Sequence, residues 1–355
     1  MTEPHGRGAA AGEQHERGDT APIPHWPGEL VSLGGYQVYV RSTPWDIPQP
    51  VIPDSDSTKL EYPGVNGSAR EPALCVHGLE GSSRNWTDLM DLLRSQLTCD
   101  ALDLPGFGDS PPRPDGRYSI AAFAQTVIAL IERRGPKYRG PVHLIGNSLG
   151  GAVCVKVTAT RPDLVRTLTL ISPALPDSRP RLDLLYFPLM CLPRVGARLL
   201  RRYQAVPAEN RVADVIVNCY SNPALFPQAR YATEVAELSR RDTLGYSAAA
   251  LVGSIRTLTA ETLRIGRHSA WRDAARITAP SLIVYGSHDR LVRPRMAGRA
   301  ARAFPGARIV VLPRTGHVAH MEHPGVVAAE IRVLLAAASQ VSAGRTREFP
   351  LAPAG

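Results

Sequence analysis

Short apolar runs alternate with longer amphipathic segments in two parts of this chain. The runs have the length and branched side chains of buried strands, and the segments between them repeat apolar residues at helical spacing. Strand and helix in strict turn predict parallel βαβ units, with helices on both faces of one sheet. The predicted strands are 73–76, 99–102, 142–145, 165–171, 281–285 and 308–312, and the predicted helices are 86–96, 120–134, 150–160, 293–304 and 325–337.

The ends of the chain and one internal segment lack these patterns. Residues 1–28 are polar and rich in Gly, His and Glu, which predicts a flexible tail, and residues 340–355 predict a second one. Two apolar runs around Gly34-Gly35 predict a β-hairpin. Residues 42–72 carry six prolines among polar residues, so we expect a long irregular connection there.

The alternation of strand and helix stops after residue 173 and resumes at residue 281. The segment between them has apolar residues at helical spacing, broken by prolines. An insertion at the carboxyl end of a strand lies above the sheet edge where open α/β folds bind ligands. We therefore expect an α/β core formed by 29–174 and 276–339, with a helical cap formed by 175–275.

Composition narrows the class of protein. The chain has 41 basic and 32 acidic residues, and only three of the basic residues are lysines. The arginines are scattered along the chain, which argues against a nucleic-acid-binding surface. Five unclustered cysteines are too few for a disulfide framework or a zinc site, which favours a reducing compartment. No signal-like apolar segment and no apolar run long enough to span a membrane is visible, so a cytoplasmic location is expected.

The stretch Gly-Asn-Ser-Leu-Gly at 146–150 makes Ser148 a candidate nucleophile. It follows the predicted strand 142–145 and leads into a predicted helix. A serine on a sharp strand-to-helix turn needs small residues two positions to either side, and the helix then adds its N-terminal N–H groups below the reacting oxygen. Because so short a motif also arises by chance, the assignment depends on partners elsewhere in the chain.

A nucleophilic serine requires a base and a carboxylate that orients it, in the chain order Ser, Asp or Glu, His. Asp289 follows the strand 281–285, and His317 follows the strand 308–312. Ser148, Asp289 and His317 would then meet at one edge of the sheet as a triad. Asp177, just past the strand 165–171, is an alternative carboxylate, and His77 is a weak alternative base because it precedes the serine.

The tetrahedral intermediate also needs two backbone donors. The N–H of Leu149 directly follows the nucleophile, and Leu79 lies in a glycine-rich turn after the strand 73–76, so these two residues are the predicted oxyanion hole. His320 and His323 follow His317 at three-residue spacing, which could suggest a metal site. No cysteine or carboxylate cluster completes such a site, so no metal and no cofactor is expected.

With these motifs in place, the chain resembles the α/β-hydrolase fold family from about residue 29 to 338. The resemblance implies an eight-stranded, mostly parallel sheet whose second strand is antiparallel, with the 42–72 connection on the face away from the site. It also implies Ser148, Asp289 and His317 as the triad, with Leu79 and Leu149 as oxyanion donors. The motifs that carry it are 77–78, 103–110, 146–151, 289 and 316–317.

The serine excludes the members of the family that need a carboxylate nucleophile, such as haloalkane dehalogenase-like and epoxide hydrolase-like enzymes. The Asn147 elbow resembles that of carbon–carbon bond hydrolases acting on ring-cleavage products. Two departures argue against that subgroup: the oxyanion turn lacks consecutive glycines, and Val318 stands where a tryptophan usually follows the histidine.

An apolar run at 184–192 is followed by arginines in the predicted cap. It is either a helix packed on the core or an acyl-binding wall that can rest on an anionic lipid surface. We expect a serine hydrolase of a small-molecule carboxylic ester, lipophilic and esterase- or monoacylglycerol-lipase-like, with peripheral membrane contact through the cap. A carbon–carbon bond hydrolase and a non-catalytic binding protein are the alternatives. The arginines are Arg194, Arg198, Arg201 and Arg202.

Overall fold

The computed structural model describes residues 23–44, 70–138, 140–177, 189–264 and 269–342. The predicted tails 1–28 and 340–355, the connection 42–72 and the apolar run 184–192 therefore lie largely outside the described residues. All five cysteines are described, and all five are free thiols, three of them buried. Within the described ranges, no helix combines the length and the apolar character needed to cross a bilayer.

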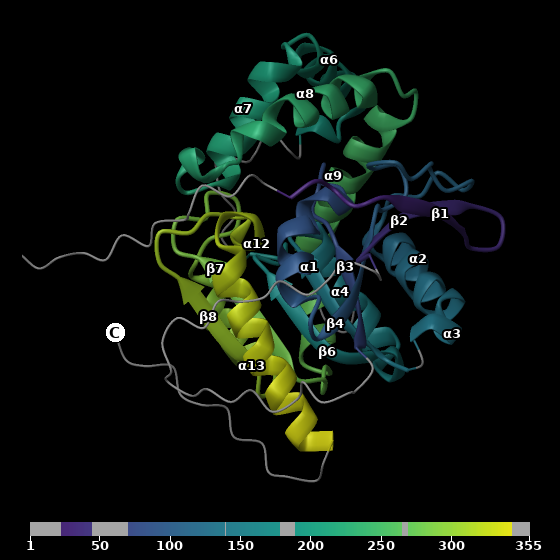
Figure 1. Cartoon of the computed structure of the whole chain (residues 1–355). Coiled ribbons are helices and arrows are strands. Elements are labelled where there is room, and N and C mark those ends of the chain that lie inside the picture. The colour runs from purple at the N-terminus through teal and green to yellow at the C-terminus, as the bar shows by residue number, and fades with distance from the viewer. Residues whose placement is uncertain (1–22, 45–69, 139, 178–188, 265–268, 343–355) are drawn as a thin grey trace, which may run out of the picture.

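The described core contains one eight-stranded sheet of order β1-β2-β4-β3-β5-β6-β7-β8 (Figure 1). β2 is antiparallel to both of its neighbours, and every other adjacent pair from β4 to β8 is parallel. This confirms the predicted fold class, including the antiparallel second strand. The strands are β1 (Gly28–Ser32), β2 (Gln37–Ser42), β3 (Glu71–Val76), β4 (Leu97–Leu102), β5 (Val142–Asn147), β6 (Val165–Ile171), β7 (Ser281–Gly286) and β8 (Arg308–Leu312).

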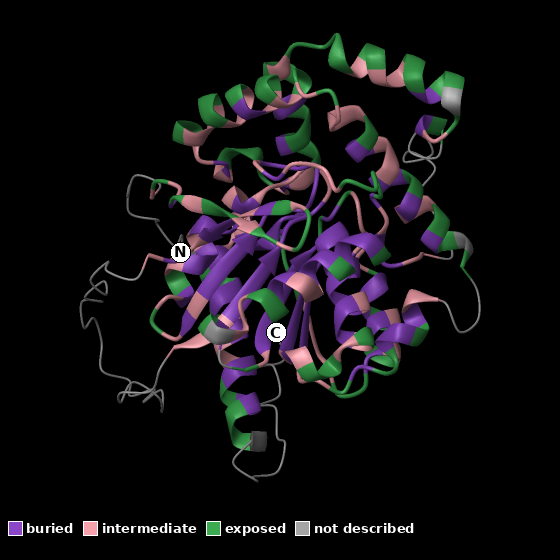
Figure 2. Ribbon diagram, turned by 90° about the vertical axis from the view of Figure 1, so that its right-hand side faces the viewer, coloured by how far each residue is buried: buried purple, intermediate pink, exposed green. Residues whose placement is uncertain are grey.

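Helices cover both faces of the sheet, so its central strands are buried along their whole length (Figure 2). On one face, α2 (Ile120–Arg133), α4 (Leu149–Thr160) and α11 (Met296–Ala303) pack into the larger apolar cluster. On the other face, α1 (Thr87–Leu93) and α13 (Pro324–Ser342) form a second cluster. The parallel strands from β3 to β8 consequently end at one common edge.

The cap helices lie together at one end of the molecule (Figure 1). They are α6 (Pro193–Gln204), α7 (Ala208–Cys219), α8 (Gln228–Asp242) and α9 (Ser247–Leu263). α9 leads back to the core, where Ala250 joins the larger cluster and the Thr257 hydroxyl accepts a hydrogen bond from Ile120 N–H. The short α10 (Ala270–Ala274) falls in the range expected for the cap, but Trp271 packs into the core cluster.

Two predicted helices begin later or end earlier than expected. The predicted helix 86–96 is split into a 3-10 turn, η1 (Ser83–Trp86), and the seven-residue α1, because the Ser82 side chain caps the turn and β4 already begins at Leu97. The predicted helix 293–304 begins only at Met296 as α11, two residues after Pro294. These shifts leave the strand ends where the sequence predicts them, to within two residues.

Candidate active site

Ser148 occupies a strained turn between β5 and α4. Its backbone has φ 52° and ψ −116°, a region that residues other than glycine rarely adopt. A Cβ atom at Gly146 would lie 2.6 Å from the Gly150 carbonyl oxygen, and one at Gly150 would lie 2.1 Å from the Val76 carbonyl oxygen. The two glycines of the motif are therefore needed for close approach of the backbone. The Ser148 side chain stays partly exposed in an otherwise buried turn.

Asp289 and His317 lie on the loops after β7 and β8 and are directly bonded. The Asp289 Oδ2 atom lies 2.9 Å from His317 Nδ1. Because a carboxylate only accepts hydrogen bonds, Nδ1 carries the proton in the neutral form of the His317 ring, which leaves Nε2 as an acceptor. The Asp289 Oδ1 atom accepts the N–H groups of Leu291 and Val292, each at 2.8 Å.

The charge state of Asp289 follows from these contacts. Burial by itself would raise the pKa of the carboxyl group, but the His317 ring and the two backbone N–H groups outweigh it and hold the pKa below its ordinary value. Asp289 is thus a buried anion whose hydrogen bonds are satisfied. The fallback carboxylate, Asp177, instead bonds the Arg295 guanidinium at 2.7 and 2.8 Å.

Asn147 connects the serine turn to the histidine loop. Its Nδ2 atom donates to the carbonyl oxygen of His317 at 3.2 Å and to that of Ile171 at 3.0 Å. No hydrogen bond joins the Ser148 hydroxyl to the His317 ring within the described chain, and such contacts commonly tighten only when substrate arrives. The sequence singles out Asn147 without predicting this bridge.

The turn after β3 lies directly beside the serine. A Cβ atom built on Gly78 would be 3.1 Å from Ser148 Cβ. Among the described residues, neither Leu79 N–H nor Leu149 N–H has a hydrogen-bond acceptor. The residues that directly follow Gly78 and Ser148 thus each carry a backbone N–H without an acceptor in the described chain.

His77 holds this turn in place. It is buried, its Nδ1 atom lies 2.7 Å from the Gly78 carbonyl oxygen, and its Nε2 atom accepts the Leu104 N–H at 2.9 Å. Burial lowers the pKa of His77 to about 4, so the ring is neutral and both of its nitrogens are engaged. This geometry fits a structural role and leaves no nitrogen available to act as a base.

The Asp103–Ser110 motif is also used to build a loop. The Asp103 carboxylate accepts the N–H of Ser83 at 2.5 Å and that of Asp109 at 2.8 Å, and Ser110 Oγ donates to the Asp103 carbonyl oxygen. Burial raises the pKa of Asp103 to about 6. The buried carboxylate ties the loop after β4 to the turn that precedes α1.

His320, the first histidine after His317, packs inside the fold. His320 is buried and stacks on Trp86, with ring centroids 4.3 Å apart. In the described ranges, no group of three or more His, Cys, Asp or Glu side chains is arranged to hold a metal ion. His320 is therefore part of the packing between α12 (Ala319–Glu322) and η1 rather than a surface residue.

A buried carboxylate that the sequence analysis did not identify joins the cap to the histidine loop. Glu322 accepts the Gly316 N–H at 2.6 Å and the Ser221 N–H at 3.0 Å. His317 N–H donates to the carbonyl oxygen of Cys219, at the end of α7, at 2.7 Å. The cap loop is thus bonded directly to the loop that carries His317. The sequence signal was that Glu322 is the single acidic residue between positions 290 and 329.

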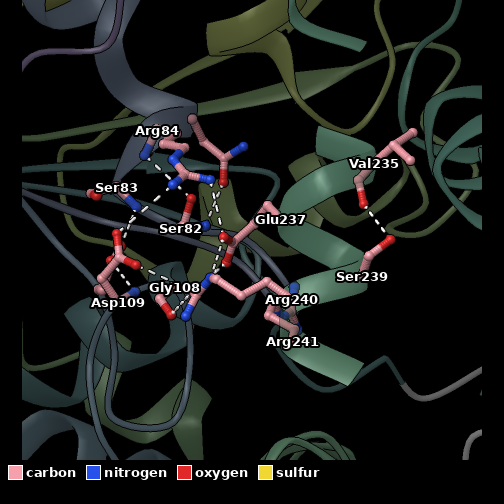
Figure 3. Close-up of polar contacts among 12 residues, drawn as sticks. Ser82, Ser83, Arg84, Gly108, Asp109, Val235, Glu237, Ser239, Arg240 and Arg241 are labelled. Atoms are coloured by element: carbon pink, nitrogen blue, oxygen red, sulfur yellow. Dashed lines mark hydrogen bonds and ion pairs between the residues drawn. The ribbon is translucent and has the colours of Figure 1, made fainter. Parts of the chain in front are cut away.

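Polar contacts fix α8 of the cap to the core turns near the site (Figure 3). Arg241 donates to the Glu80 carbonyl oxygen at 2.8 Å, one residue beyond Leu79. Glu237 forms an ion pair with Arg84 at 3.2 Å. Arg240 extends the network to Gly108 and Asp109.

An apolar cluster of the cap also reaches the serine turn. Met190, Leu251 and Ile255 are buried together, and Leu79 packs against this cluster as well as against the core. The residue that offers one of the two free N–H groups therefore has an apolar surrounding provided by the cap.

Residues 72–324 match the family model described as the alpha/beta hydrolase fold, and the chain belongs to this family. It is 28% identical over 268 residues to the pimeloyl-[acyl-carrier protein] methyl ester esterase of Neisseria meningitidis, covering 72% of this chain and 90% of that protein. It is 26% identical to the dihydrolipoyllysine-residue acetyltransferase component of the acetoin cleaving system of Pseudomonas putida, covering 88% and 74%.

The 2-hydroxy-6-oxononadienedioate/2-hydroxy-6-oxononatrienedioate hydrolase of Cupriavidus pinatubonensis is 24% identical, covering 77% of this chain and 89% of that protein. Among solved structures, Lip1 of Acinetobacter baumannii superposes with a TM-score of 0.66 at 19% identity, covering 89% of this chain and 93% of that one. The protein is thus an α/β hydrolase with both esterase and carbon–carbon hydrolase relatives.

Proposed function

We propose that this protein is a serine hydrolase that cleaves a carboxylic ester through an acyl-enzyme intermediate. The observation that carries the proposal is the combination at one sheet edge of a strained Ser148, two free N–H groups beside it and a bonded Asp289–His317 pair. Together these supply a nucleophile, a site for the developing negative charge and a base of fixed tautomer.

In the proposed reaction, Ser148 Oγ attacks the acyl carbonyl carbon while His317 Nε2 takes the hydroxyl proton. The Leu79 and Leu149 N–H groups stabilise the oxyanion of the tetrahedral intermediate. His317 then returns the proton to the leaving alcohol, and Asp289 stabilises the imidazolium throughout. Water repeats the same path, which releases the acid and restores Ser148.

The surroundings of Leu79 favour a lipophilic acyl group. The cap cluster of Met190, Leu251 and Ile255 provides an apolar wall next to one proposed oxyanion donor. An alkyl chain that leaves water for such a wall contributes about 0.8 kcal/mol per buried methylene. The esterase relative, which acts on a pimeloyl ester, is consistent with an extended acyl chain.

A carbon–carbon bond hydrolase is the second candidate, supported by the Asn147 elbow and the relative from Cupriavidus pinatubonensis. The Asn147 amide, however, is buried and donates to two backbone carbonyl oxygens. An architectural use of Asn147 requires no particular substrate, so the ester remains the first choice.

The decisive experiment compares Ser148→Ala with Ser339→Ala, a matched serine on the exposed side of α13. We expect Ser148→Ala to lose labelling by a fluorophosphonate probe and turnover of p-nitrophenyl esters, with its far-UV circular dichroism unchanged. Ser339→Ala should keep both activities. Undiminished ester turnover by Ser148→Ala would rule out the proposed nucleophile.

A panel of acyl esters of increasing chain length, run beside a ring-cleavage dienoate, separates the two candidate reactions. Higher kcat/KM for the longer esters supports the lipophilic ester proposal. Faster turnover of the dienoate than of every ester favours carbon–carbon cleavage. A wild-type chain that is folded but neither labelled nor active on either class is a binding protein.

A further inference from the structure

Four arginines share the outward face of α6. Because residues in a helix advance by about 100° each, Arg194, Arg198, Arg201 and Arg202 fall within one sector of its circumference. All four are exposed. The opposite side of the helix packs on the cap, where Leu199 and Leu200 contact the Leu251 cluster. α6 therefore packs on the cap through its apolar side, and the charged side chains on its outward side are all arginines.

The other arginines of the cap are used differently. Residues 189–264 contain ten arginines and six carboxylates, and α6 holds four of these arginines and no carboxylate. Each of the six arginines outside α6 has a partner in the structure, whereas the four on α6 pair with no acidic side chain in the described part of the chain. The six partnered residues are Arg211 (Asp242), Arg230 (Asp88), Arg240 (Glu237), Arg241 (Glu80), Arg264 (Glu261) and Arg256 (Cys191 carbonyl).

Exposed apolar side chains lie next to this cationic face. Leu189 is 46% exposed, Leu192 is 49% exposed and Val195 is 42% exposed. They occupy the approach to α6 and its first turn, within seven residues of one another along the chain. Large apolar residues beside a row of cations are typical of surfaces that rest at a lipid–water interface.

We infer that the outward face of α6, together with Leu189, Leu192 and Val195, docks on the surface of an anionic lipid membrane. In this arrangement the guanidinium groups contact lipid phosphates, which arginine binds through several N–H donors at once. The leucines enter the boundary between headgroups and acyl chains. This binding goes beyond the proposed ester cleavage and does not require it.

The observations favour a membrane over an acidic protein as the partner. α6 lies at the outer end of the cap, farthest from the sheet (Figure 1), and a helix with exposed side chains forms a ridge on the surface. A protein partner needs a complementary surface shaped around such a ridge, whereas a lipid bilayer deforms around it. Membrane affinity also uses both chemical features of the patch, because apolar insertion and charge attraction add.

Vesicle co-sedimentation of the full chain tests the inference. We expect binding to vesicles of equal parts phosphatidylcholine and phosphatidylserine, little binding to pure phosphatidylcholine, and a decrease as salt is added. Arg198→Gln/Arg202→Gln should weaken the partition coefficient on the anionic vesicles by roughly thirtyfold, at about fivefold for each arginine. Leu189→Ser/Leu192→Ser should weaken it as well, by an amount that salt does not change.

The matched control is Arg133→Gln/Arg302→Gln, which removes the same charge from exposed positions on α2 and α11. It should bind vesicles like the wild type, and all variants should turn over a short water-soluble ester at the wild-type rate. Equal weakening by the control pair would mean that only net charge matters, which overturns the inference. Retention on immobilised polyglutamate without any vesicle binding would assign the face to an acidic protein and overturn it too.

Discussion

The sheet edge that carries Ser148 and the cap above it are held together by different kinds of interaction. At the sheet edge, positions are set by strand register, close glycine contacts and hydrogen bonds to backbone groups, as around Asp289 and His77. The cap is held by ion pairs between arginines and carboxylates on different elements, both within the cap and between the cap and the core. Strand register holds the backbone of the sheet edge tightly. Ion pairs of arginine near the surface are weakened by salt and by protonation of the carboxylates, so the attachment of the cap depends more on salt and pH.

The two regions meet at the histidine loop. There the Cys219 carbonyl oxygen of the cap accepts the His317 N–H, and the Glu322 carboxylate accepts the Ser221 N–H of the cap and the Gly316 N–H of the loop. The cap is thus attached to the part of the core where the proposed base resides. A movement of the cap can therefore change the position of His317 through these hydrogen bonds.

We expect the largest effect from Asp289→Asn, which tests whether hydrogen bonds at the sheet edge hold the proposed base in position. An amide at this position can donate to His317 Nδ1 and so stabilise the wrong tautomer, leaving Nε2 protonated. We expect kcat/KM on an ester to fall by about 10⁴-fold, as for loss of the orienting carboxylate in serine proteases. Steady-state kinetics measures this, and circular dichroism checks the fold.

Asp177→Asn is the matched control, because Asp177 also follows a strand end but is paired with Arg295. It should keep ester kcat/KM within a few-fold of the wild type. If the large loss instead followed Asp177→Asn, the acid would belong to that strand and the geometry of the Asp289–His317 pair would be structural only.

The next effect tests the junction between the regions. Glu322→Gln replaces an acceptor of several N–H groups with an amide that donates from one side, so the Gly316–Ser221 bridge weakens. We expect kcat to fall by up to about 10²-fold, the scale of a displacement of about 1 Å in a catalytic group. KM should change less, because Glu322 is buried and bonds backbone groups of the cap and of the histidine loop. The measurement is kcat and KM on the same ester.

The control for the junction is Glu330→Gln on α13, which breaks the Arg308 ion pair on another side of the core. Its kcat should match that of the wild type. A fall in melting temperature without a fall in kcat for Glu322→Gln would show that the bridge supports stability alone, and the proposed route from cap to histidine would be wrong.

The sequence predicted the sheet, its order of strand and helix, and the loops that carry Ser148, Asp289 and His317. These features can be predicted from local patterns. The spacing of apolar side chains identifies the strands, and the carboxyl ends of parallel strands lie at the same edge of the sheet. The choice between Asp289 and Asp177 was not local, since both follow strand ends. Only the packing of β7 beside β8 brings Asp289 against His317.

The contacts that the sequence could not predict join distant segments. Asn147 and His317 are 170 residues apart, and Ser221 and Glu322 are 101 apart. The periodicity of the sequence does not predict such pairings, because they depend on which distant loops of the core and of the cap meet in the folded chain. The cap is also where proline-broken helices gave the weakest pattern in the sequence.

The smallest expected effect contrasts a neutral histidine ring buried in the core with the charged side chains of the cap. Burial lowers the pKa of His320 to about 3, so folding excludes a proton that the unfolded chain binds below its pKa of 6.5. Proton binding by the unfolded chain therefore lowers the free energy of unfolding as the pH falls from 6.5 toward 3. Above pH 6.5 this loss is absent.

At about pH 5.5 the loss amounts to roughly 1.4 kcal/mol relative to pH 8. His320→Phe keeps the stack on Trp86 without titrating, so the variant should gain about that much on the wild type between pH 8 and 5.5 in urea unfolding. The exposed His288→Gln serves as the control and should show no such gain. Parallel pH curves for wild type and His320→Phe would show that the buried His320 ring does not cause this loss of stability, and the prediction would be wrong.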